Sequence, residues 1–63
     1  MYMATKTLYI ENSKETFEAY KKIENTFPCW IDVTPIEMNY SEVTIRAREE
    51  DMASIEKILA PFA

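Results

Sequence analysis

The sequence predicts a single α+β domain of 63 residues with the element order β-α-β-β-α. One reason is that the period of the apolar residues changes along the chain, from two in half-buried strands to three or four in helices. A second reason is composition, because 48% hydrophobic and 29% charged residues are typical of a folded protein. No linker or repeat divides the sequence, so residues 1–63 are expected to form one domain.

The first strand and the first helix are each predicted from local patterns. Apolar and polar residues alternate over residues 3–10, and Lys6 interrupts the inner face, which suggests a strand at a sheet edge. Asn12 followed by Glu15 resembles a capping box, and aromatic and aliphatic residues then recur every three or four positions. A helix is therefore expected over residues 13–26.

A hairpin and a second helix complete the prediction. The second strand is expected over residues 29–38 with a bulge or an edge position at Pro35, a turn over 39–41, and a third strand over 42–48. The acidic run 49–51 suits the start of a second helix, which Pro61 closes. Because the chain has no glycine, left-handed turn positions are expected to fall on asparagines such as Asn12, Asn25 and Asn39.

A hydrophobic core follows from the inward-facing positions of these elements. We expect it to contain Leu8, Ile10, Phe17, Tyr20, Ile23, Phe27, Ile31, Val33, Val43, Ile45, Met52, Ile55, Ile58 and Leu59. A right-handed strand-helix-strand crossover would place both helices on one face of the three-stranded sheet and leave the other face open.

The element order resembles a ferredoxin-like split β-α-β fold that lacks its final strand, a likeness of topology only. The resemblance implies that the first strand lies at the edge where the missing strand would pair, which makes Thr5, Lys6 and Thr7 candidate edge residues. Such an edge invites a homodimer through the first strand or capture of a strand from another protein. The alternative is an edge that Lys6 protects from pairing.

The open sheet face is the candidate partner-binding surface. It is predicted to carry Thr5, Thr7, Tyr9, Trp30, Asp32, Thr34, Thr44, Arg46 and Arg48. Tryptophan, tyrosine and arginine are enriched where binding energy concentrates in protein interfaces. The alternative is structural: Trp30 covers the sheet or is buried in a dimer, and the arginines pair with Asp32 and Glu42.

The residue types argue against an enzyme and against a bound metal or cofactor. The chain has no histidine, the commonest general base and metal ligand, and its lone Cys29 has no imidazole to activate it. We expect Cys29 to be buried and inert, in a reducing, cytoplasmic setting. The acidic run 49–51 suits a helix start better than calcium, and no glycine-rich phosphate loop exists.

Charge and composition lead to three functional hypotheses. A formal charge of −4 disfavours nucleic acid, and no apolar run or leader suggests a membrane span or a secretory signal. The first hypothesis is therefore a small acidic protein-interaction module, an inhibitor or adaptor that blocks a larger protein, including one that processes nucleic acid. The alternatives are an RNA- or nucleotide-binding module that uses the open face, and a self-associating regulatory or small-molecule-binding dimer.

Overall fold

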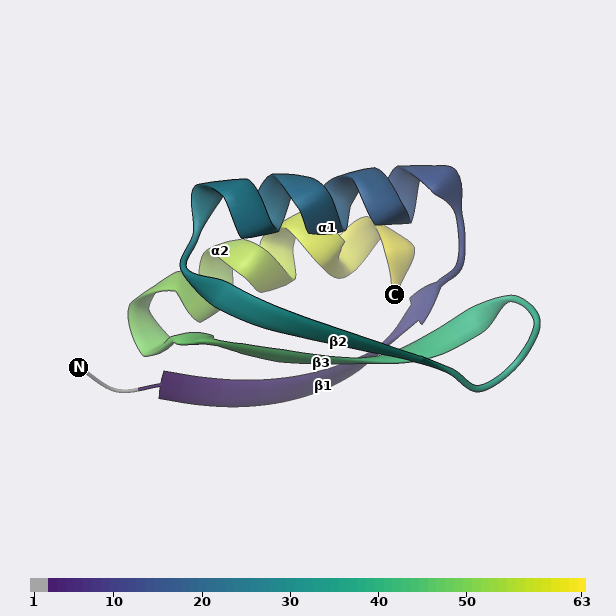
Figure 1. Cartoon of the computed structure of the whole chain (residues 1–63), viewed down its shortest axis with the longest axis horizontal. Coiled ribbons are helices and arrows are strands. Elements are labelled where there is room, and N and C mark those ends of the chain that lie inside the picture. The colour runs from purple at the N-terminus through teal and green to yellow at the C-terminus, as the bar shows by residue number, and fades with distance from the viewer. Residues whose placement is uncertain (1–2) are drawn as a thin grey trace.

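The computed structural model describes residues 3–63 and confirms the α+β fold with the order β-α-β-β-α (Figure 1). A short 3-10 turn follows the second helix. The elements are β1 (Met3–Glu11), α1 (Lys14–Thr26), β2 (Cys29–Pro35), β3 (Tyr40–Arg48), α2 (Glu49–Leu59) and η1 (Ala60–Phe62).

The sheet has the order β1-β3-β2, with β3 antiparallel to both neighbours. The strands β1 and β2 are therefore parallel to each other and form the two edges. Figure 1 shows α1 and α2 side by side on the same face of the sheet, which leaves the opposite face uncovered as predicted. Among residues 3–63, neither helix is long and apolar enough to cross a membrane.

The core lies between this sheet and the helices, and most of its predicted members are confirmed. The fully buried side chains include Ile10, Ile23, Val43, Ile45, Ile55 and Leu59. Two predicted members are wrong: Phe17 is 50% exposed and Val33 is 37% exposed. The core also includes two small residues that were not predicted, Ala19 of α1 and Ala47 of β3.

The start of α1 differs from the predicted capping box. Ser13, not Asn12, is the N-cap residue, and its Oγ accepts a hydrogen bond from the backbone N–H of Thr16 at 3.1 Å. Asn12 instead ties the β1–α1 connection to β3, because its Oδ1 accepts a hydrogen bond from Ser41 Oγ at 2.6 Å.

Replacement of Ser13 by alanine is expected to lower the free energy of unfolding by about 0.5–2 kcal/mol, because it leaves an N–H of the first turn without its side-chain acceptor. Chemical denaturation followed by circular dichroism measures the loss. Ser54→Ala is the matched control, since Ser54 is exposed within α2 and alanine is the better helix former there. Equal stability of the two variants would contradict the capping role.

The hairpin between β2 and β3 also departs from the prediction. β2 ends at Pro35 and β3 already begins at Tyr40, so the reversal covers residues 36–39 instead of 39–41. No residue in the range 3–63 has a positive φ angle, so the asparagines expected in left-handed turns do not adopt that conformation. The longer connection makes the reversal without it, and backbone N–H groups of Ile36 and Glu37 both donate to Tyr40 O.

Candidate protein-binding face

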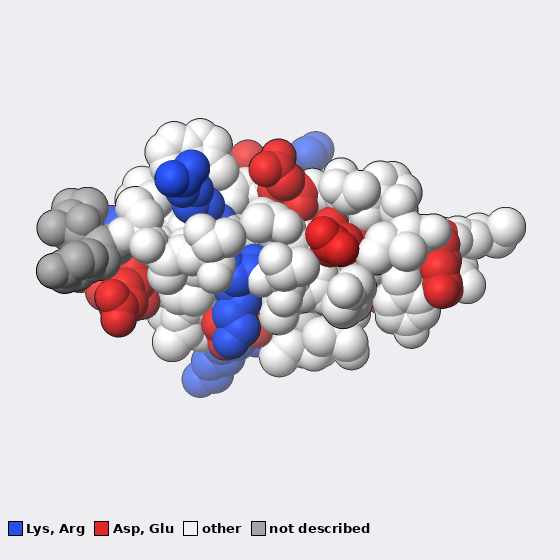
Figure 2. All heavy atoms as spheres, turned by 90° about the horizontal axis from the view of Figure 1, so that it is seen from below, with Lys and Arg blue, Asp and Glu red and all other residues white. Residues whose placement is uncertain are grey.

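The open face of the sheet is a grid of side chains whose rows are set by the strand register. Adjacent rows consist of Thr5, Arg46 and Trp30, then Thr7, Thr44 and Asp32, then Tyr9, Glu42 and Thr34. The predicted face residues other than Arg48 therefore lie on one continuous surface. Seen from this side, Figure 2 shows scattered positive and negative side chains on a mostly uncharged surface.

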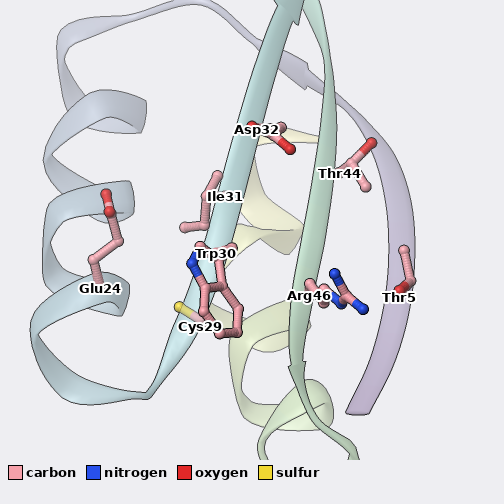
Figure 3. A pocket seen from close by; sticks show the side chains of 8 residues that line it. All are labelled: Thr5, Glu24, Cys29, Trp30, Ile31, Asp32, Thr44 and Arg46. Atoms are coloured by element: carbon pink, nitrogen blue, oxygen red, sulfur yellow. The ribbon is translucent and has the colours of Figure 1, made fainter.

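Trp30 is the most prominent apolar group of this face. It lies on the edge strand β2 with 66% of its surface exposed. A shallow hollow of about 450 Å³ surrounds it (Figure 3). The hollow is lined by Thr5, Glu24, Cys29, Trp30, Ile31, Asp32, Thr44 and Arg46. The indole therefore does not serve as a cover for the sheet within the single chain.

Arg46 supplies a free cation beside the tryptophan. It lies on β3 directly opposite Trp30 of β2 and Thr5 of β1. Its side chain is exposed, and it forms no ion pair with any residue in the range 3–63. In Figure 3 the guanidinium extends over the sheet toward Thr5. The predicted alternative, a pair between this arginine and Asp32 or Glu42, is therefore not formed.

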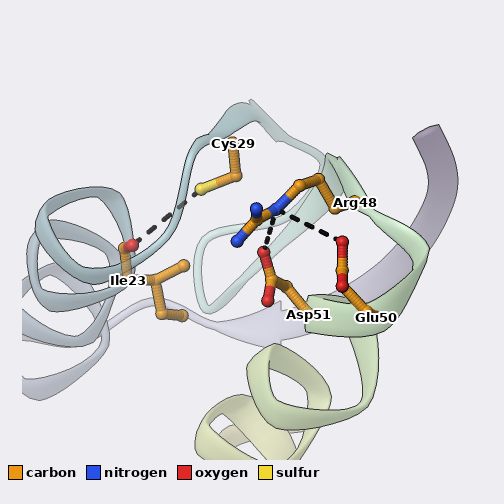
Figure 4. Close-up of polar contacts among 5 residues, drawn as sticks. All are labelled: Ile23, Cys29, Arg48, Glu50 and Asp51. Carbon is orange, nitrogen blue, oxygen red and sulfur yellow. Dashed lines mark hydrogen bonds and ion pairs between the residues drawn. The ribbon is translucent and has the colours of Figure 1, made fainter. Parts of the chain in front are cut away.

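Arg48 is the one predicted face residue whose charge is already engaged. Its Nε donates to Asp51 Oδ2 at 2.7 Å and lies 3.8 Å from Glu50 Oε1 (Figure 4). The hydrogen bond to Asp51 raises the pKa of the Arg48 guanidinium above its ordinary value. Arg48 thus joins the end of β3 to the first turn of α2, and only Arg46 of the two predicted arginines is free.

Tyr9 belongs to a second apolar patch at the hairpin end of the face. It is 61% exposed and lines a hollow of about 250 Å³ with Ile36, Glu37 and Tyr40. The neighbouring Met38 is 93% exposed. Sequence reasoning placed residues 36–38 inside a strand and missed this patch. The signal was the cluster of large apolar residues after Pro35, which interrupts the alternation of β2.

Cys29 is only partly buried, in contrast to the full burial expected, and it is poorly suited to nucleophilic chemistry. Its Sγ lies 4.0 Å from the backbone oxygen of Ile23 (Figure 4). Burial raises the pKa of the Cys29 thiol, and the nearby carboxylates of Glu24 and Asp51 raise it further. The fraction of reactive thiolate at neutral pH is correspondingly low.

Alkylation of Cys29 by iodoacetamide at pH 7.5 is therefore expected to be slower in the folded chain than in urea. Replacement of Glu24 by glutamine should accelerate it, because loss of a negative charge lowers the pKa of the thiol. Glu18→Gln, an exposed position on the same helix, is the control. Mass spectrometry measures the rates, and no acceleration in the Glu24 variant would contradict the electrostatic explanation.

The described residues contain no cluster of three or more acidic, cysteine or histidine side chains that could hold a metal ion. Comparisons of the chain with protein-family models, with curated proteins and with solved structures found no match. The candidate site therefore rests on its own geometry.

Proposed function

We propose that the chain is a protein-interaction module, an inhibitor or adaptor that docks on a larger protein through its open sheet face. The observation that carries this proposal is Trp30, exposed on an uncovered sheet with the unpaired Arg46 beside it. These two residue types are the ones most enriched among residues that dominate binding energies. Their setting on paired strands also means that little backbone or loop ordering is needed on binding.

The grid of the face indicates the chemistry of the complementary surface. A pocket on the partner would cover the indole of Trp30, and a carboxylate or carbonyl group would accept hydrogen bonds from Arg46. Thr5, Thr7 and Thr44 add short hydroxyl side chains that allow close approach. The formal charge of −4 favours encounter with a basic protein, including one whose basic surface holds nucleic acid. Such a partner and the lone cysteine favour a cytoplasmic location.

Capture experiments with matched variants test this function. The parent chain, Trp30→Ala and Phe17→Ala are immobilised, and proteins retained from a lysate are compared by quantitative mass spectrometry. A true partner is retained by the parent and by Phe17→Ala, whose aromatic ring is exposed on the helical side, and is lost with Trp30→Ala. Purified partner should then bind stoichiometrically, with an affinity about 30-fold lower for the Trp30 variant. Retention that does not depend on Trp30 would contradict the proposal.

The geometry favours a protein over RNA or a nucleotide as the ligand of this face. Tyr9 and Trp30 lie on opposite edge strands with the Thr7 row between their rows, so they do not form one stacking platform. Asp32 and Glu42 lie in the intervening area, and Arg48 is held by Asp51. Trp30 is the only tryptophan, so its fluorescence reports on this face directly. Quenching by oligonucleotides that weakens progressively with salt would instead assign the face to nucleic acid.

A further inference from the structure

The outer edge of β1 carries backbone groups that the domain itself does not use. β1 is nine residues long and pairs only with β3, over its whole length. In an antiparallel ladder, residues alternate between those that bond to the neighbouring strand and those whose N–H and C=O groups point away from it. Every second residue of β1 must therefore present both groups outward.

The register identifies these residues. The backbone N–H of Asn12 donates to Asn39 O at 2.7 Å, which continues the β1–β3 pairing and marks a hydrogen-bonded pair. Even-numbered residues of β1 therefore bond to β3. Thr5, Thr7 and Tyr9 direct their N–H and C=O groups away from the sheet.

The opposite edge strand, β2, is protected against pairing with a further strand, whereas β1 is not. Ile36 N–H donates to Tyr40 O in register with the β2–β3 pairs, so odd-numbered residues of β2 face outward. Pro35 is one of them, and a proline has no N–H to offer a further strand. Within Met3–Glu11 there is no proline, and the register with β3 contains no bulge.

Lys6, the residue expected to protect β1, is turned toward the helical layer. Its Nζ lies 3.2 Å from Glu56 Oε1 of α2. An edge lysine discourages pairing when its charge would meet an incoming strand. Here the ammonium group is paired with a helix of the same chain and held away from the strand edge, which stays accessible.

We propose that this edge pairs with a second copy of the chain, as an antiparallel β1–β1′ contact that joins two sheets into one of six strands. The chain is self-complementary in one register. With Thr7 on the two-fold axis, all nine residues of β1 are paired, Thr5 lies opposite Tyr9 of the other copy, and Lys6 lies opposite Leu8. If one strand slid by two residues in one direction, the two Lys6 side chains would lie opposite each other. If it slid by two residues in the other direction, strand ends would be left unpaired.

Self-pairing through β1 is independent of partner binding, because it uses the backbone of an edge strand and leaves the Trp30 face open. Self-association is tested by sedimentation velocity from about 5 μM to 1 mM. The parent chain is expected to reach twice the mass of one chain, and Thr7→Pro to remain a monomer, since proline removes the outward N–H on the axis without breaking a bond to β3. Val33→Pro, at an outward position of β2, is the control that should still dimerise.

Each other outcome overturns the proposal. A parent chain that is monomeric at 1 mM has no self-pairing edge. A Thr7→Pro variant that dimerises as well as the parent places the contact elsewhere. If only Val33→Pro dissociates the dimer, the contact lies at β2. If the chain is a monomer that binds a strand of another protein at β1, the edge is a binding site for that protein and not for a second copy.

Disulfide trapping tests the register and does not depend on whether the proline variants fold. In a Cys29→Ser background, Thr7→Cys should form a covalent dimer on mild oxidation, because residues on the axis face each other at about 5.5 Å between Cα atoms. Thr5→Cys alone should not, since the two copies of Thr5 would lie about 13 Å apart. A mixture of Thr5→Cys and Tyr9→Cys should cross-link again. The reverse pattern would exclude the proposed register.

Discussion

Truncation of Ile45 to alanine is expected to lower the free energy of unfolding by about 2–5 kcal/mol. Ile45 lies on the central strand β3, opposite Lys6 of β1 and Ile31 of β2, and its side chain is fully buried. The substitution removes apolar contacts between the sheet and the helical layer. It leaves a cavity that the paired strands cannot close. A domain of 63 residues has a small core, so a loss of this size is expected to unfold a large share of the molecules at 25 °C.

Ile36→Ala is the matched control for this experiment. The same side chain is removed, but Ile36 lies at the hairpin end and is 52% exposed. Its truncation is expected to change stability by no more than about 0.5 kcal/mol. Urea denaturation followed by circular dichroism measures both variants. A cost for Ile45→Ala below 1 kcal/mol, or equal costs at the two positions, would contradict the assignment of the buried sheet face.

The sequence was most informative where an element is covered along its whole length. In β3, the central strand, Val43, Ile45 and Ala47 are all fully buried, as strict alternation predicts. Val33 has the same periodicity but is exposed, because it lies on the edge strand β2, whereas its partner Val43 on the central strand is fully buried. Alternation reports which face a side chain occupies, and it does not report how far the opposing layer reaches.

Helix α1 shows a related effect of how the helix is oriented on the sheet. The buried stripe consists of Thr16, Ala19, Tyr20 and Ile23, whereas Phe17 lies beside it and packs edge-on against Tyr20 with ring centroids 6.0 Å apart. Hydrophobicity alone favours Phe17 as a core residue. The buried residues instead follow the spacing i, i+3, i+4, i+7 from Thr16, and Phe17 lies beside that face, so the orientation of the helix on the sheet decides which side chains are buried.

The candidate face was predictable in outline for the same reason as the core. Strand parity placed Thr5, Trp30 and Arg46 on one face, and the register brought them into one row. The alternation of side chains along β3 could not indicate that Arg48 is held by Asp51 at the start of α2, because that contact depends on how the chain turns from strand to helix. The apolar patch at Tyr9 depends likewise on where β2 ends.

Replacement of Tyr20 by phenylalanine is expected to stabilise the domain by about 1–3 kcal/mol. Tyr20 is 6% exposed, and its hydroxyl is buried without a hydrogen-bond partner among residues 3–63. Burial of an unpaired hydroxyl forfeits its hydrogen bonds to water, and phenylalanine fills nearly the same volume without that cost. Tyr9→Phe is the control, because the Tyr9 ring is 61% exposed and its hydroxyl stays hydrated whether or not the chain is folded.

The pH dependence separates this explanation from a simple packing effect. Burial raises the pKa of the Tyr20 hydroxyl, so the folded chain keeps this proton while the unfolded chain loses it near pH 10. The unfolded state then binds fewer protons, and stability falls as the pH rises from about 10 toward the raised pKa of the folded state. The stability advantage of Tyr20→Phe should therefore be constant from pH 6 to 9 and widen above pH 10. An advantage that stays constant to pH 11 would mean that the phenol reaches water in the native state, because only a phenol shielded from solvent resists ionisation there.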